Sequence, residues 1–261
     1  MKEMPGLRET HILERGHYSN RGEVVGRASP AVLPTFPQGE PINRLGLAKW
    51  LTSSDHPLMA RVTVNRYWQM IFGSGLVSTS EDFGMQGKPP THPELLDWLA
   101  RDFINSGWNM HHLLKKMVLS HTYRQESKIL KFALEEDPEN LLLSRAPAYR
   151  LPAEMIRDGL LAHSGLLHKK TGGPGAKPYD LKVSFKPINP DGAPNVYRRS
   201  VYTFWKRTAP TPVMMAMDAS KRDVCTVRRE RTESPSQSLI MLNSTQFVET
   251  ARASADTLVQ T

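Results

Sequence analysis

The sequence lacks several features that would restrict its function. It has one cysteine, Cys225, which excludes an internal disulfide and a cysteine-rich zinc site. Because it has no Cys-x-x-Cys-His motif, this chain binds no c-type haem covalently. Its apolar runs, such as residues 239–242, are far shorter than the roughly 20 residues of a membrane-spanning helix. We therefore expect no membrane span.

Common catalytic motifs are also missing. There is no His-Glu-x-x-His motif and no Gly-x-Ser-x-Gly elbow, and the adjacent His111 and His112 would point apart on a helix, so we predict no bound metal. The glycine-rich residues 172–177 lack the Gly-Lys-Ser/Thr ending of a phosphate loop, and Pro178 would interrupt the helix that should follow. Cys225 has no nucleophile signature, and we expect a small buried hydrophobe there.

Charge is the first positive feature. The chain has 34 Lys and Arg against 26 Asp and Glu, a net charge of +8, which suits nucleic acid, an anionic glycan or an acidic protein partner. The opening residues Met1, Lys2 and Glu3 do not have the form of a secretory signal, so we expect none in this stretch.

A change of pattern divides the chain near residue 42. Residues 1–42 have few periodic apolar positions and hold Pro5, Pro30, Pro34, Pro37 and Pro41, which indicates an extended strap. At 261 residues one large domain or two packed lobes are both allowed, and we favour one helical domain over residues 43–261. No repeat of 20 to 50 residues is present, which excludes a solenoid or propeller.

Helical periodicity dominates the second region. It predicts helices over residues 43–51, 57–73, 91–107, 110–122 and 152–165, and capping patterns at Thr91, Ser234 and Asn243 mark helix starts. Residues 169–195 are rich in glycine and proline and indicate a long irregular segment. Residues 200–205 form the one plausible strand. The predicted class is mainly α, an irregular helical domain with a long N-terminal strap and at most a small β-sheet, of two or three strands near residues 200–206.

Several ordered motifs carry a family resemblance. They are Asn65-Arg66-Tyr67-Trp68, residues 72–77, 81–84 and 92–99, Ser120 with Tyr123-Arg124-Gln125, residues 152–158 and 172–174, Arg198-Arg199-Ser200, Asp218, residues 228–231, Gln237 and Asn243. Together they resemble the planctomycete PSD-one domain, the domain of unknown function numbered fifteen fifty-three, over roughly residues 5 to 255.

The resemblance implies a setting but no reaction. Proteins of this family look like exported bacterial chains in which a cytochrome-c-like domain and a second uncharacterised domain precede this one. It thus implies a periplasmic or extracellular location, the preceding domains of the same polypeptide as partners, and haem c in one of those domains but no cofactor in this chain. The family pattern also continues past Thr261, so we expect that a terminal helical portion is lacking.

Three residues are the candidates for catalysis. Asp82, His92 and Arg124 lie near glycine or proline turns, where loops could present them in a cleft, and His121 is close to Arg124. An imidazole and a carboxylate could perform acid–base chemistry. Turn chemistry is the alternative: Asp82 would cap the turn before Gly84, and His92 would bond within its own helix start.

Arginine is the most distinctive residue of the C-terminal half. We predict ligand-binding roles for Arg199, Arg207, Arg228, Arg229, Arg231 and Asp218, with at least three arginines converging on one concave patch, because guanidinium groups suit bidentate contact with carboxylate, sulfate or phosphate. The alternative is a structural network in which the arginines pair with Asp218, Asp223, Glu230 and Glu233.

Three functions remain open. The first is a module that binds an anionic polysaccharide or docks a partner domain through the arginines. The second is a hydrolytic or redox enzyme domain that acts on polysaccharide through Asp82, His92 and Arg124. The third is nucleic-acid binding, which is unlikely because no recognition motif accompanies the arginines.

The last predicted helix, from Asn243, has an apolar stripe. Phe247, Val248, Ala251, Ala255 and Leu258 follow its period. We expect Leu258 and Val259 to be exposed on an apolar patch of the kind that favours association.

Overall fold

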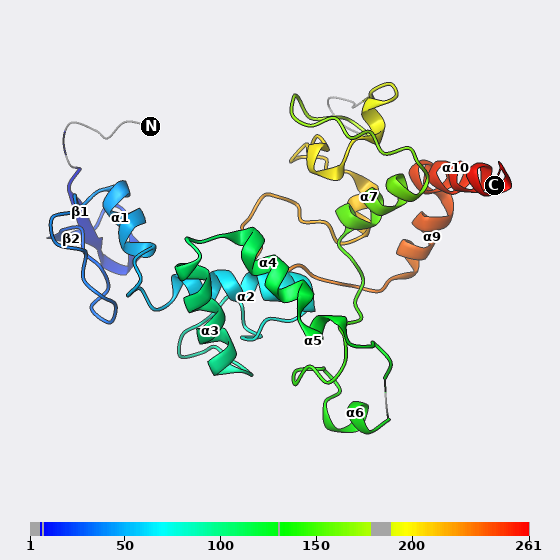
Figure 1. Cartoon of the computed structure of the whole chain (residues 1–261). Coiled ribbons are helices and arrows are strands. Elements are labelled where there is room, and N and C mark those ends of the chain that lie inside the picture. Colours follow the sequence, from blue (N-terminus) through cyan, green and yellow to red (C-terminus); the bar gives the residue numbers. More distant parts are fainter. Residues whose placement is uncertain (1–5, 7, 130, 179–188, 261) are drawn as a thin grey trace. The chain divides into compact units, whose positions relative to one another are not determined.

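The computed structural model describes residues 6, 8–129, 131–178 and 189–260. In these residues it has ten α-helices and two strands, of four and five residues, so the prediction of a mainly α fold is confirmed. The chain divides into two compact units, Met1–Pro147 and Ala148–Thr261 (Figure 1). Pro5, residues 179–188 of the expected irregular segment, and Thr261 lie outside the described residues.

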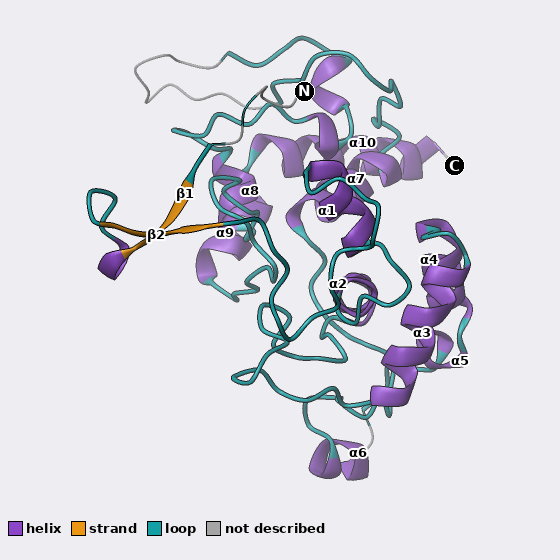
Figure 2. Ribbon diagram, turned by 90° about the vertical axis from the view of Figure 1, so that its left-hand side faces the viewer, coloured by secondary structure: helices purple, strands orange, loops and turns teal. Residues whose placement is uncertain are grey.

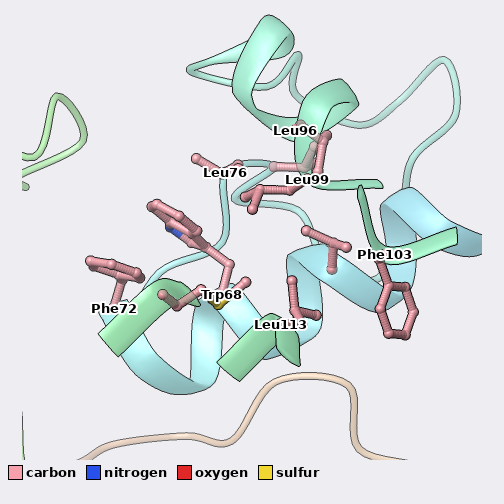
Figure 3. Close-up of a cluster of buried hydrophobic side chains, with 10 residues drawn as sticks. Trp68, Phe72, Leu76, Leu96, Leu99, Phe103 and Leu113 are labelled. Carbon is pink, nitrogen blue, oxygen red and sulfur yellow. The ribbon is translucent and has the colours of Figure 1, made fainter. Parts of the chain in front are cut away.

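The first unit contains six helices. They are α1 (Arg44–Leu51), α2 (Met59–Phe72), α3 (Pro93–Asn105), α4 (Met110–Leu119), α5 (His121–Arg124) and α6 (Lys131–Glu136). Helices α2, α3 and α4 each place a stripe of large apolar side chains on one face, and these stripes meet in the main core (Figure 3). Phe103 and Leu113 are almost fully buried there.

Helix ends in this unit follow local chemistry. The Nδ1 atom of His56 accepts hydrogen bonds from the amides of Leu58 and Met59 and so starts α2, which ends at Gly73 with a positive φ of 86°. Ser120 separates α4 from α5 because its backbone is extended and its hydroxyl accepts from the amide of Tyr123. The prediction of a single helix over residues 110–122 was therefore wrong.

Two of the predicted capping patterns are also wrong. The hydroxyl of Thr91 donates to the carbonyl of Leu76, 3.3 Å away, so it is not the cap of α3, whose N-cap residue is His92. Asn243 lies in the last turn of its helix and donates to the carbonyl of Leu239. At Ser234 the helix does begin, but without a side-chain cap bond. The side chains of Thr91 and Asn243 therefore do not cap a helix, because each donates a hydrogen bond to another carbonyl.

The sheet lies in the strap and not near residues 200–206. Strands β1 (Thr10–Leu13) and β2 (Arg21–Val25) form an antiparallel hairpin with an irregularity between His11 and Leu13 (Figure 2). Farther along the strap, the indole nitrogen of Trp50 donates to the carbonyl of Pro34, and Phe36 stacks on the same ring. The strap is thus attached to α1 through Trp50 and through Lys49, whose Nζ donates to the carboxylate of Glu40 at 2.7 Å.

The second unit contains α7 (Ala153–His163), two 3₁₀ helices, η2 (Asn195–Tyr197) and η3 (Ser200–Tyr202), and then α8 (Pro212–Ala216), α9 (Pro235–Asn243) and α10 (Thr245–Gln260). Its buried apolar cluster is small, with Ala153, Met214, Met217 and Ala219 at the centre. Buried polar side chains, above all Arg157 and Arg198, occupy much of the rest of the interior.

The strand predicted at residues 200–205 is instead the 3₁₀ helix η3. The amide of Ser200 donates to Oδ1 of Asp158 on α7 at 2.7 Å, and the Ser200 hydroxyl accepts from Arg157. Only Thr203 keeps a bridge of the β type, to Ala176. The β-branched and aromatic composition misled the prediction because tertiary hydrogen bonds decide this backbone.

Candidate functional site

Asp82 holds a turn. Its Oδ1 atom accepts a hydrogen bond of 2.7 Å from the amide of Gly84, and its carbonyl accepts one from the hydroxyl of Thr79. A Cβ at Gly87 would lie 2.2 Å from the same carbonyl, so the turn requires glycine there. These bonds match the turn alternative for Asp82.

His92 and Arg124 occupy different settings. The Nδ1 atom of His92 lies 2.9 Å from the hydroxyl of Thr91 at the start of α3. Arg124 is exposed on α5 and lines a shallow, open hollow with His121, Thr122 and Gln125. Within the described residues, no hydrogen bond or ion pair joins Asp82, His92 and Arg124 to one another. The hollow that Arg124 lines includes His121, three residues earlier, but neither Asp82 nor His92.

In the second unit, Asp218 is a hub for hydrogen bonds. It has a positive φ of 62°, and its carboxylate accepts from the amide of Thr232 at 2.7 Å, from the Thr232 hydroxyl at 2.9 Å, and from the guanidinium of Arg150. Gln237 donates to it at 3.4 Å. Burial raises the pKa of Asp218, but these donors outweigh burial and hold the pKa below its usual range. Asp218 thus anchors the start of α9 to Arg150.

Two carboxylates of α7 engage the arginines of the C-terminal half. Glu154 accepts from Arg229 at 2.5 Å, and Oδ2 of Asp158 lies 3.7 Å from Nε of Arg199. Burial raises the pKa of Glu154, but Arg229 and a backbone amide outweigh it and lower that pKa. The network alternative named Asp218, Asp223, Glu230 and Glu233 as partners, whereas Arg229 and Arg199 pair with Glu154 and Asp158 of α7.

Two buried arginines fix loops to helices. Arg157 donates to the carbonyls of Arg198 and Val196 at 2.8 Å and 2.7 Å, and burial lowers its pKa more than nearby Asp158 raises it. Arg198 donates to the carbonyls of Gly172, Pro174 and Lys170. Both side chains thus hold backbone segments together through hydrogen bonds to carbonyls.

Three arginines of this unit stack on aromatic rings. Their guanidinium carbons lie 4.0 to 4.6 Å from the ring centres: Arg198 over Tyr202, Arg231 over Tyr149 and Arg222 over Trp205. At these distances the negative ring face attracts the cation. Stacking holds a guanidinium plane while leaving its edge able to donate.

We call residues 221–231 the arginine segment. It holds Lys221, Arg222, Arg228, Arg229 and Arg231 against two acidic residues, and all of it except Val227 is exposed. Arg222, Arg229 and Arg231 are held by Trp205, Glu154 and Tyr149. Arg228, like Arg207 outside the segment, makes no side-chain hydrogen bond or ion pair with the described residues. The convergence of these arginines on one concave patch stays a prediction.

Among the residues that the structure describes, no group of three His, Cys, Asp or Glu side chains could hold a metal ion. Cys225 is exposed in the arginine segment, so the expectation of a buried cysteine was wrong. A c-type haem is attached through two cysteines, so a chain with one cysteine does not fit it. No described helix is long and apolar enough to cross a membrane.

A family model decides the classification. The model of PSD1, a protein of unknown function (DUF1553), matches residues 43–261. The chain belongs to the PSD1 family. No curated protein and no solved structure matches it. The PSD1 match begins where the predicted strap ends, so the β1–β2 hairpin lies outside the matched range.

The structure gives PSD1 motif residues roles that sequence reasoning missed. Asn65, in the Asn-Arg-Tyr-Trp motif, is fully buried and bonds both backbone groups of Val77. Arg157 and Arg198 tie backbone segments together, and Glu154 accepts a hydrogen bond from Arg229, 75 positions away. The only signal available was their place within motifs, because a sequence does not show which long-range carbonyl or carboxylate an arginine will meet.

Proposed function

We propose that this PSD1 chain is a non-catalytic module that binds an anionic polysaccharide through the arginine segment. The observation that carries the proposal is the exposed segment itself, whose guanidinium groups are held in place by aromatic rings and by a carboxylate. Residues 198–231 hold nine Lys or Arg and three Asp or Glu, so they account for most of the net charge of +8. A repeating sulfate or carboxylate polymer matches such a row of cations.

Pre-positioning favours binding over a merely solvated surface. A free arginine loses about 0.5–1.5 kcal/mol of side-chain freedom when a ligand immobilises it. Arg222 and Arg231 are already stacked on aromatic rings, and Arg229 is already paired with Glu154. Part of their side-chain freedom is therefore lost when the chain folds, and less remains to be lost when a ligand binds. Arg228 lies beside them and has its guanidinium available for a bidentate contact with a sulfate or carboxylate.

The cellular setting is part of the same proposal. An exported protein that carries a cytochrome-c-like domain, as the family resemblance implies, would meet polysaccharide outside the cytoplasm. The module would then hold the polymer close to the preceding domains. An enzymatic function is less well supported, because Asp82 and His92 are engaged in local turns and Arg124 lies in an open hollow.

The test is binding to heparin, polygalacturonate and double-stranded DNA across a salt series. We expect heparin to bind, with affinity that falls as salt rises, and Arg228→Ala and Arg231→Ala to weaken binding severalfold. Arg228→Lys keeps the charge but loses bidentate geometry, so it should restore only part of the affinity. Arg101→Ala removes an exposed arginine of the first unit and is the matched control.

Other results would contradict the proposal. If heparin does not bind, or if both arginine variants bind as the wild type does, the arginine segment is not the binding surface. If DNA binds more tightly than either polysaccharide at equal salt, nucleic-acid binding is the better assignment. Turnover of polygalacturonate that is lost in Asp82→Asn would favour the enzymatic alternative.

A further inference from the structure

Helix α10 presents its polar face to the rest of its unit. Thr250 is buried, and Gln246 and Ser254 on the same face are half-buried. Gln246 accepts a hydrogen bond from Arg157 at 3.3 Å and donates to the carbonyl of Pro178 at 2.5 Å. These side chains share a face because they recur at intervals of four residues. The helix is thus attached through hydrogen bonds.

Most of the apolar stripe of α10 points outward, and of its five predicted members only Phe247 is half-buried. Val248, Leu258 and Val259 are 51%, 76% and 87% exposed, and Ala251 and Ala255 between them are exposed as well. The predicted exposure of Leu258 and Val259 is confirmed. Positions 248, 251, 255 and 258 follow the alternating three- and four-residue spacing of a coiled-coil seam. At about 100° per residue, they lie between about 80° and 160° around the helix from Thr250.

This orientation is the reverse of the usual one for a surface helix, whose apolar stripe faces the core. Each large aliphatic side chain left in water forgoes the stabilisation that burial would give it. On α9, Leu239 and Leu242 are also largely exposed. The ordered apolar stripe is therefore a surface suited to a second helix.

The charges and the side-chain sizes along the stripe indicate that the second helix is α10 of another copy of this chain. Arg252 and Asp256 lie on the same flank of the stripe, with Nε and Oδ2 4.0 Å apart and both side chains exposed. When two copies of α10 pack antiparallel about a two-fold axis, like flanks meet, and each Arg252 comes beside Asp256 of the partner subunit. Ala251 and Ala255 lie at the centre, where two crossing helices approach most closely, and Val248 and Leu258 lie at the ends.

We propose that the chain forms a two-fold symmetric dimer through antiparallel packing of α10. The stripe is self-complementary, as an isologous interface requires. One helix pair makes a small interface, so the dimer dissociates at low concentration. This proposal is independent of polysaccharide binding, because it uses a different surface.

The first experiment measures molar mass by sedimentation equilibrium from about 1 µM to about 1 mM, a range that covers weak association. We expect a reversible monomer–dimer equilibrium. Ala255→Glu puts a charge at the centre of the stripe and should raise the dissociation constant at least tenfold. Thr257→Glu places the same side chain off the stripe and should leave it within twofold. Circular dichroism checks that both variants keep their helix content.

Charge reversal tests the antiparallel arrangement. Arg252→Asp and Asp256→Arg should each be monomeric, because each puts like charges together across the axis. Mixed in equal amounts, they should form a 1:1 heterodimer, since each chain then carries one sign on its flank. A wild type that stays monomeric throughout overturns the proposal. So does a dimer that Ala255→Glu does not weaken, or a mixture of the two charge variants that does not associate.

Discussion

Asn65 offers the sharpest test of how the first unit is held together. Its side chain is fully buried on α2. Oδ1 accepts from the amide of Val77 at 2.9 Å, and Nδ2 donates to the carbonyl of Val77 at 3.0 Å and to the hydroxyl of Ser80 at 3.1 Å. A Cβ at Gly75 would lie 2.7 Å from Nδ2, so glycine makes room for the amide.

Asn65→Ala removes these three hydrogen bonds, leaves the amide of Val77 buried without a partner, and leaves the Val77 carbonyl only the Ser80 hydroxyl, 3.3 Å away. A buried amide without a partner costs about 1–3 kcal/mol, and the lost bond to the carbonyl about 1 kcal/mol more. We therefore expect a loss of about 2–4 kcal/mol in the free energy of unfolding. Against a total of about 5–15 kcal/mol for a domain, this is enough to lower the melting temperature markedly.

Asn65→Asp separates hydrogen bonding from volume. The carboxylate can still accept from the amide of Val77, but its second oxygen faces the Val77 carbonyl and repels it. Burial and this repulsion should raise the pKa of the introduced carboxyl in the folded state. A raised folded-state pKa means that stability is highest below the unfolded-state pKa of about 3.9 and falls as pH rises. The penalty relative to wild type should therefore grow from about pH 4 toward neutrality.

Urea unfolding followed by tryptophan fluorescence is the assay, because Trp50, Trp68, Trp98 and Trp108 lie in the first unit and only Trp205 in the second. Asn109→Ala, which removes the N-cap of α4, is the control and should cost about 0.5–2 kcal/mol. The reasoning is refuted if Asn65→Ala costs no more than Asn109→Ala. A penalty for Asn65→Asp that does not change with pH would also refute it.

Two further predictions concern acid stability and burial. The lowered pKa of Asp218 in the folded state contributes stability at pH values above the unfolded-state pKa of about 3.9, and this stability is lost as pH falls below that value. Asp218→Asn should therefore destabilise the second unit at pH 7 and flatten its acid transition. Thermal unfolding between pH 3 and 7 measures both effects, and an unchanged acid transition would contradict the prediction. Leu113→Ala, in the core, should cost about 2–5 kcal/mol, whereas Leu258→Ala should stay within about 0.5 kcal/mol in urea unfolding of the monomer; equal costs would show that Leu258 is buried in solution.

Much of the architecture was readable from the sequence. The stripes on α2, α3 and α4 have helical period, and Gly73 and Gly107 take positive φ where the pattern predicted helix ends. The resemblance carried by the sequence motifs also predicted the family, and helical periodicity predicted the mainly α class. These features are local, because periodicity, backbone freedom and the missing amide of proline depend on neighbours within a few residues.

The candidate site was predictable only in part. The arginine-rich stretch was visible, but its partners were not: Glu154 of α7 for Arg229, Tyr149 for Arg231 and Trp205 for Arg222. Asp82 and His92 looked chemical because turn residues and catalytic residues are drawn from the same types. Whether such a residue holds a turn or performs catalysis depends on which atoms surround it in the folded chain, and the sequence does not show those atoms.

The sequence by itself thus determined the helical class, the main core stripes and the concentration of positive charge. Only the tertiary structure decided that residues 200–202 form a 3₁₀ helix and that the amide of Asn65 bonds both backbone groups of Val77. It also decided that most of the apolar stripe of α10 is exposed. The physical reason is range. A helix or a charge excess arises from residues close in sequence, whereas a buried amide or guanidinium takes whichever distant backbone group the packed chain leaves unsatisfied.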